Sequence, residues 1–190
     1  MRKIPQYLEN PIDNIFIYFS EIAAPFYNKL KFTANTLTSI SLILGLISSV
    51  LFLYDDYKLS ALVFLLAYYF DCADGFYARK YKLTSKFGDM YDHFADYLKM
   101  GLILLLMFSK NSKKFFTIIL PIFIVFGLLT TVQIGCQEKY KKDDDHGDML
   151  HATRNMCKED PENVMQISKY FGLGTLMLVF SILIFTYGDF

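Results

Sequence analysis

Four aspartates lie close together in the segment 71–96, between two strongly apolar stretches. Asp71 and Asp74 are three residues apart, and Asp92 and Asp96 are four apart, so each pair shares one face of a helix. Two antiparallel helices joined by a short loop would bring the four carboxylates together. Carboxylate oxygens suit Mg²⁺ or Mn²⁺, and two such ions can clamp a pyrophosphate for in-line displacement. The spacing therefore predicts a metal site for a phosphate-bearing substrate.

Small residues accompany these aspartates. Gly75 and Ala78 follow Asp71 on the same helix face, and Gly88 precedes Asp92 by one turn. Such residues leave room beside the carboxylates for a bulky ligand.

Two other roles remain open for the acidic residues. A charged group within a transmembrane helix costs about 2.5–3.5 kcal/mol, and such groups also mark ion and proton pathways. Ion pairing with Arg79 or Lys99 would offset part of that cost.

The elements around these residues are apolar helices. Hydrophobic residues make up 54% of the 190-residue chain, and its mean hydropathy is +0.30. Because crossing a membrane takes about 20 apolar residues, a soluble domain of this size could not bury three such runs. The sequence predicts an all-α, multi-pass transmembrane helical bundle, and the zero net charge gives no reason to expect a nucleic-acid partner. The uncharged runs are 33–54, 115–137 and 170–188.

The predicted chain has four parts. Apolar residues recur every three or four positions over 11–30, which indicates an amphipathic helix in the membrane interface. The parts are an N-terminal segment with this helix (1–32), a transmembrane core (33–136), a polar cytosolic loop (137–163) and a C-terminal transmembrane helix (164–190). The expected spans are about 33–54, 59–79, 85–108, 114–136 and 164–187.

The placement of Lys and Arg predicts the orientation. Thirteen lie in 1–32, 79–86 and 137–163, against four in 55–58 and 109–114. Because cytosolic loops carry an excess of Lys and Arg, the N-terminus and the acidic segment are expected at the cytosolic face.

The three cysteines, Cys72, Cys136 and Cys157, match no zinc or redox spacing. We expect them to be buried or reduced thiols.

The acidic segment also resembles a known signature. Residues 71–96 match D-x2-D-G-x2-A-R-x8-G-x3-D-x3-D at every fixed position, a pattern similar to that of the CDP-alcohol phosphatidyltransferase family. Upstream, F-T-A-N-T-L-T at 32–38 resembles the family's P-N-x-[IL]-T opening of the first span, with Ala34 in place of the usual Pro. The resemblance covers about residues 10–136. Since the family usually has six spans, five to six are expected.

This resemblance implies a function in phospholipid synthesis. A phosphatidyl or phosphoaminoalcohol group would pass from a CDP-linked lipid or aminoalcohol donor to a hydroxyl acceptor, with release of CMP. It implies two Mg²⁺ or Mn²⁺ ions and a homodimer in the lipid membrane. The implied metal ligands are Asp71, Asp74, Asp92 and Asp96, with Asp96 also the general base. The implied donor-binding residues are Asn35, Thr38, Gly75, Ala78, Arg79, Ser85 and Gly88.

The sequence does not decide which kind of CDP-linked donor is used, and it does not exclude two other classes of protein. Tyr91–Asp92–His93 resembles choline/ethanolamine phosphotransferases, whereas S-K-F-G-D at 85–89 resembles synthases that use CDP-diacylglycerol. A Mg-dependent membrane prenyltransferase would need two separate Asp motifs and a longer chain. A non-catalytic or ion-conducting membrane protein would not need every position of the motif filled.

Overall fold

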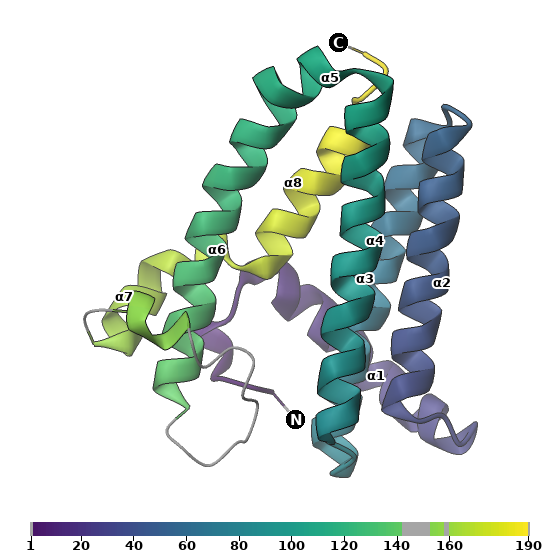
Figure 1. Ribbon diagram of the computed structural model, residues 1–190. Helices are drawn as coiled ribbons and strands as arrows, with labels where there is room; N and C mark the ends of the chain where they lie inside the picture. Colours follow the sequence, from purple (N-terminus) through teal and green to yellow (C-terminus); the bar gives the residue numbers. More distant parts are fainter. Residues whose placement is uncertain (1, 142–152, 158–159, 190) are drawn as a thin grey trace.

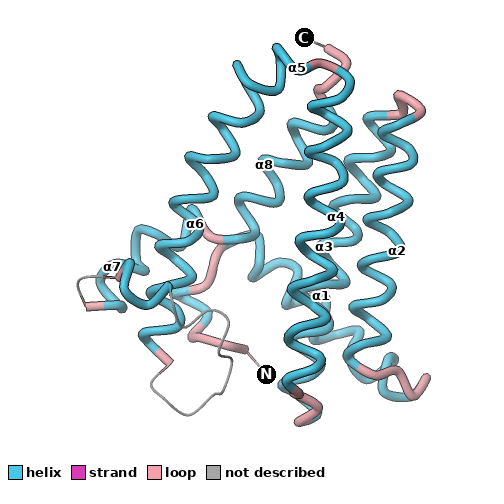
Figure 2. Tube along the Cα trace, viewed as in Figure 1, coloured by secondary structure: helices cyan, strands magenta, loops and turns pink. Residues whose placement is uncertain are grey.

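The computed structural model describes residues 2–141, 153–157 and 160–189, and within them it contains helices and no strand (Figures 1 and 2). The predicted all-α class is confirmed. The longer helices are α1 (Pro11–Lys29), α2 (Ala34–Leu53), α3 (Tyr57–Tyr81), α4 (Lys86–Lys110), α6 (Leu120–Tyr140) and α8 (Leu173–Phe185). The short elements are the 3-10 helices η1 (Gln6–Leu8) and η4 (Lys169–Phe171), α5 (Ser112–Lys114), the π-helical turn η2 (Phe115–Ile119) and α7 (Pro161–Ser168).

Polar side chains set where the helices begin. The Asn10 side chain accepts hydrogen bonds from the first turn of α1, and Thr33 forms a capping box with Thr36 at the start of α2. The Ser85 hydroxyl accepts a hydrogen bond of 3.0 Å from the Gly88 amide and so caps α4. These caps place Asn35 in the first turn of α2 and Gly88 in the first turn of α4.

The two helices that carry the aspartates are both anchored on α2. Helix α3 packs against α1, α2 and α8, while α4 packs mainly against α2. In the described part of the chain, α3 and α4 make few close backbone contacts with each other. Aromatic residues such as Phe52, Phe64 and Phe180 fill the core away from the aspartates. The aspartates are not part of this aromatic core.

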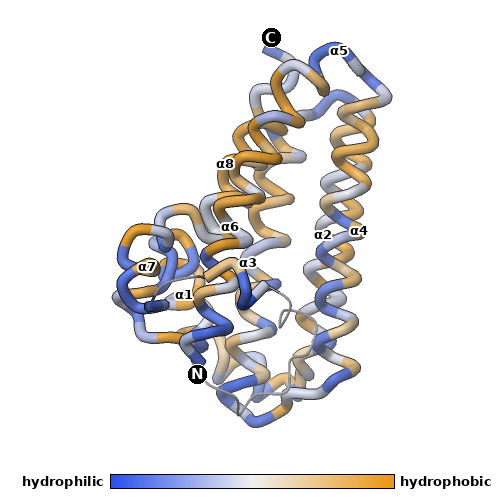
Figure 3. The backbone as a smooth tube through the Cα atoms, turned by 60° about the vertical axis from the view of Figure 1, so that its left-hand side comes forward, coloured by the Kyte–Doolittle hydropathy of each residue, from blue (hydrophilic) through white to orange (hydrophobic). Residues whose placement is uncertain are grey.

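Four stretches of the described chain are long and apolar enough to cross a membrane. They are Ala34–Leu53, Tyr57–Tyr81, Ser112–Tyr140 and Pro161–Phe185. Helix α4, the remaining expected span, has 25 residues but is not among these stretches; Lys86, Asp89, Asp92 and Asp96 lie in its first half. Figure 3 shows hydrophobic residues along α2, α4, α6 and α8, and hydrophilic residues gathered near the N-terminus and α7.

The expected span over 164–187 falls largely in one of these stretches, but the helix there is interrupted. Gly172 has an extended backbone (φ −69°, ψ −178°) and separates α7 and η4 from α8, which has only 13 residues. Figure 1 shows α7 beside the lower end of α6 and α8 inside the bundle. Helix α6 also continues to Tyr140, inside the expected loop 137–163. Much of that loop, at 142–152 and 158–159, lies outside the described residues.

Helix α1 turns an apolar face away from the protein. Ile15, Phe19, Ile22 and Phe26 are exposed, whereas Ala24 on the other side is fully buried. An exposed apolar stripe on a helix outside the spanning stretches fits the predicted position in the membrane interface.

Two cysteines differ from the prediction. Cys136 and Cys157 form a disulfide that joins α6 to the described segment before α7, while Cys72 is a free thiol.

Candidate active site

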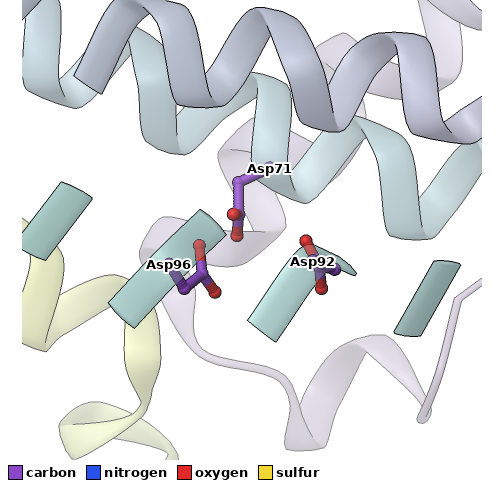
Figure 4. A group of neighbouring side chains, drawn as sticks. All are labelled: Asp71, Asp92 and Asp96. Carbon is purple, nitrogen blue, oxygen red and sulfur yellow. The ribbon is translucent and has the colours of Figure 1, made fainter. Parts of the chain in front are cut away.

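Three carboxylates converge between α3 and α4. One oxygen each of Asp71, Asp92 and Asp96 lies within 4.8 Å of the others. Figure 4 shows Asp71 pointing from its helix toward Asp92 and Asp96 on the neighbouring one. Asp92 and Asp96 lie one turn apart on α4, so their side chains leave the same face.

The arrangement fits a divalent metal ion. Within the described residues, Asp92 Oδ1 is buried without a hydrogen-bond partner, while Asp96 Oδ1 lies 2.7 Å from the Lys99 ammonium group. In an octahedral Mg²⁺ site neighbouring oxygens lie about 2.9 Å apart and opposite ones about 4.2 Å, so the three groups would have to move closer together to share an ion. Because buried carboxylates without donors are costly, a bound cation would relieve both the missing contacts and the mutual repulsion.

Asp74 lies outside this group of three. Its Oδ2 accepts a hydrogen bond of 2.5 Å from the Thr38 hydroxyl on α2, and its side chain is buried. The sequence pattern placed all four aspartates in one cluster. The structure brings three together and holds Asp74 beside them against α2.

Lys99 forms ion pairs with two of the three carboxylates. Its Nζ lies 2.8 Å from Asp71 Oδ1 and 2.7 Å from Asp96 Oδ1, and it donates to the Ser41 hydroxyl at 2.7 Å. The lysine is 2% exposed. The ammonium group therefore links α4 to both α3 and α2 at the centre of the site.

The close approach of α2 to Lys99 depends on a glycine. A methyl group at Gly45 would lie 2.6 Å from the Lys99 Cβ, well inside van der Waals contact. Sequence reasoning treated Lys99 only as one available ion-pair partner and did not single out Gly45 or Ser41. The glycine within the uncharged run 33–54 is the signal that could have indicated close packing there.

A first cavity of about 140 Å³ opens beside Asp74 and Asp92. Its remaining wall comes from the starts of α2 and α4 and the end of α3. At Gly88, an added methyl group would lie 3.1 Å from the Asn35 side chain, so the glycine keeps this space open. All seven residues expected to bind the donor line the cavity: Asn35, Thr38, Gly75, Ala78, Arg79, Ser85 and Gly88.

A second cavity of about 210 Å³ also reaches the carboxylates. It includes Asp71 and Asp96, which the first cavity does not, and it shares Asp74, Gly75, Arg79 and Asp92 with the first. The carboxylates are thus reached by two cavities with different walls.

His93 and Asp13 are among the residues in the wall of the second cavity that were not predicted as site residues. His93 Nδ1 lies 3.8 Å from Asp92 Oδ2. Asp13 of α1 accepts a hydrogen bond of 2.5 Å from the Tyr68 hydroxyl, and burial raises the pKa of Asp13 to about 7. Asp13 is therefore held in place by α3 near the three converging carboxylates without joining them.

Comparison with known proteins gives a match over most of the chain. The family model described as CDP-alcohol phosphatidyltransferase matches residues 31–188. No solved structure shows a significant match.

Curated relatives match a shorter stretch. A protein of Rickettsia felis named CDP-diacylglycerol--glycerol-3-phosphate 3-phosphatidyltransferase is 44% identical over 55 residues, which are 29% of this chain and 30% of the relative. A Treponema pallidum protein of the same name is 32% identical over 79 residues, 42% of this chain and 37% of the relative. The chain thus spans about a third of the length of these relatives.

Proposed function

Because the chain belongs to the CDP-alcohol phosphatidyltransferase family, we propose that it is a membrane enzyme that transfers a substituted phosphate group from a CDP-linked donor to a hydroxyl acceptor. The observation that carries this proposal is the convergence of Asp71, Asp92 and Asp96 at the meeting of two cavities. One cavity would hold the donor and the other the acceptor, so that both meet at the carboxylates.

The relatives favour one donor branch. They are named for CDP-diacylglycerol and glycerol 3-phosphate, and they match this chain only in part. We therefore propose CDP-diacylglycerol as the donor and a small hydroxyl compound as the acceptor. The four apolar stretches would keep the enzyme in the membrane, where a lipid-linked donor is found.

The first cavity would hold the nucleotide and its phosphates. Arg79 offers a planar guanidinium fork that matches phosphate oxygens. Gly75 and Gly88 let the ligand approach the helix backbones, and Asn35 and Thr38 provide polar contacts from α2.

Asp71, Asp92 and Asp96, with Asp74 beside them, would hold Mg²⁺ or Mn²⁺, as expected for a family that is generally dependent on divalent metals. Two ions would neutralise the pyrophosphate and lower the pKa of the acceptor hydroxyl. Asp96, which lines only the second cavity, would take the proton from that hydroxyl as it attacks. Lys99 would keep Asp71 and Asp96 oriented throughout.

Two further features belong to this proposal. The distribution of Lys and Arg favours a cytosolic position for the carboxylates. Family resemblance favours a homodimer, which crosslinking of the purified protein in detergent would test.

The direct test uses purified protein in detergent with Mg²⁺. CDP-diacylglycerol, CDP-choline and CDP-ethanolamine are each offered with glycerol 3-phosphate, inositol, serine and diacylglycerol, and release of CMP is followed. We expect release with CDP-diacylglycerol and loss of that release in EDTA. Full activity in EDTA would contradict the metal site, and no CMP with any pair would contradict the transferase function.

A further inference from the structure

The second cavity has a wall that the family match does not include. That match begins at residue 31, yet Lys3, Glu9, Asp13 and Ile17 line the cavity. The rest of the wall includes the carboxylates, the basic residue Arg79 of α3, and Gln133 and Gln137 of α6. Residues before the first span therefore help to enclose the reacting groups.

The N-terminal segment is fixed in this position. Lys3 Nζ lies 2.6 Å from Glu138 Oε1 of α6, and Lys169 donates to the Tyr7 carbonyl at 2.8 Å. Ile4 and Leu8 are buried against Cys136, Cys157 and Met165. These contacts make the segment a built wall of the cavity.

The end of the cavity near this segment is polar. Glu9 is 7% exposed, and its Oε1 accepts a hydrogen bond of 3.3 Å from the Gln137 amide. The Lys3 ammonium has three donor hydrogens, and among the described residues it contacts Glu138, which leaves donor hydrogens for a ligand. The Lys3 ammonium group would match an anionic group of a ligand. The Glu9 carboxylate and the amides of Gln133 and Gln137 would match its hydroxyl groups.

The size of the cavity limits the ligand. A cavity of about 150 Å³ can hold benzene. The second cavity, at about 210 Å³, has room for a molecule slightly larger than benzene. A small polyol phosphate fits this space.

We propose that Lys3 and Glu9 form the recognition end of the acceptor site, for an acceptor of the kind for which the relatives are named, a small polyol phosphate. Lys3 would bind the phosphate, and Glu9 would accept a hydrogen bond from a hydroxyl that does not react. This proposal rests on the proposed transferase function.

The transfer reaction would take place where the two cavities meet. The acceptor oxygen forms a bond to the lipid-bearing phosphorus of the donor, and the bond from that phosphorus to the bridging oxygen breaks. The proton of the acceptor hydroxyl passes to Asp96. CMP leaves through the first cavity with the electron pair of the broken bond.

The test measures how Lys3 affects recognition of glycerol 3-phosphate. We expect Lys3→Met to raise the KM for glycerol 3-phosphate at least tenfold, with kcat and the donor KM within twofold of wild type. Lys3→Arg should restore most of the loss. Arg2→Met is the matched control, because Arg2 bonds to Asn14 and does not line the cavity, and its kinetics should equal those of wild type. An unchanged acceptor KM in Lys3→Met, or an equal rise for donor and acceptor, would overturn the proposal.

A double variant separates loss of acceptor binding from loss of folding in Lys3→Met. Lys3→Met leaves Glu138 without its close partner, so Lys3→Gln combined with Glu138→Gln removes both charges together. If Lys3→Met unfolds, this double variant should show the same rise in acceptor KM. Unaltered acceptor kinetics in the folded double variant would also overturn the proposal.

Direct binding separates this inference from the transferase function. Calorimetric titration of glycerol 3-phosphate into protein with Mg²⁺ and CMP should show binding that is at least tenfold weaker in Lys3→Met. Such binding without any CMP release from wild type would overturn the transferase function and support the site. CMP release with equal binding by wild type and variant would overturn the site alone.

Discussion

The ammonium group of Lys99 lies 2.8 Å from one oxygen of Asp71, and the lysine is almost completely buried. The same group lies 2.7 Å from Asp96, so one lysine balances carboxylates from both helices of the motif. The site therefore has an internal cation even before a metal ion binds.

Removal of this cation should destabilise the metal-free protein. Because breaking a buried ion pair leaves uncompensated charge, we expect Lys99→Met to lower the free energy of unfolding by about 3–5 kcal/mol. Mg²⁺ should restore part of that loss by supplying the missing positive charge. Thermal unfolding in detergent, with and without Mg²⁺, measures both effects. Lys110→Met, which breaks the more exposed pair with Asp55, should show no dependence on Mg²⁺. The same loss for Lys99→Met at every Mg²⁺ concentration would count against a shared metal and lysine site.

Asp96→Asn should separate binding from reaction. The amide keeps the shape of the side chain but cannot take a proton, so we expect transfer to fall at least a hundredfold while the CDP donor still binds. CMP release and titration with CDP-diacylglycerol measure the two properties. Asp55→Asn, at the connection between α2 and α3, is the control and should retain activity. Equal losses of binding and turnover in Asp96→Asn would argue against a base role.

Gly45→Ala should disturb the site from the neighbouring helix. The added methyl group would lie 2.6 Å from the Lys99 Cβ, so α2 and α4 must move apart. We expect a loss of about 1–3 kcal/mol in stability and a clear loss of CMP release. Gly101→Ala on α4 meets no atom within 4 Å and should be neutral or stabilise by up to about 1 kcal/mol. Similar unfolding temperatures for the two variants would contradict the close packing at Gly45.

Asp13 should make the stability of the protein depend on pH. Burial raises its pKa from 3.8 to about 7, and the nearby charges of Glu9 and Asp71 act in the same direction, while the Tyr68 hydrogen bond opposes them. Between these two values the folded protein keeps a proton that the unfolded chain has released. Stability therefore falls as pH rises from about 4 to 7, and the loss is complete above pH 7.

Asp13→Asn removes this titration. Its stability relative to wild type should increase from pH 4 to pH 8 by up to about 4 kcal/mol, measured by thermal unfolding. Glu21→Gln, on the exposed side of α1, should follow the wild-type pH profile. A constant difference between Asp13→Asn and wild type across this range would contradict a buried, titrating Asp13.

The paired cysteines test the proposed orientation. Disulfides are rare in the cytosol, so with the carboxylates at the cytosolic face we expect Cys136 and Cys157 to be thiols in the cell and to pair after purification in air. Alkylation of freshly lysed cells followed by mass spectrometry of the peptides measures their state. Cys72→Ser removes the remaining thiol and simplifies the readout. Both cysteines protected from alkylation at lysis would contradict the cytosolic orientation.

Local pattern predicted the elements that carry the site. The uncharged runs correspond closely to α2, α6 and α8, because about 20 apolar residues can only be accommodated as helix in lipid. Helical spacing also placed Asp92 and Asp96 on one face, and the seven expected donor residues line one cavity. These features follow from residues near each other in sequence or from a short, specific motif.

Contacts between segments that are far apart in the sequence could not be predicted from local residue patterns. Thr38 holds Asp74 across 36 positions, and Gly45 admits Lys99 from another helix. The break at Gly172 occurs where α8 begins close to Asn10 and Asp13 of α1, a tertiary contact that no apolar periodicity records. The spacing of Cys136 and Cys157 likewise matched no known pattern.

The wall of the second cavity joins the beginning of the chain to its last third. Lys3 pairs with Glu138, and Tyr7 bonds to Glu162 at 2.7 Å and to Lys169. A ribosome therefore has to deliver these late residues before the first ten acquire their partners. The aspartates would enter the membrane early in synthesis. The wall of the second cavity would close around them only after the last third of the chain has been made.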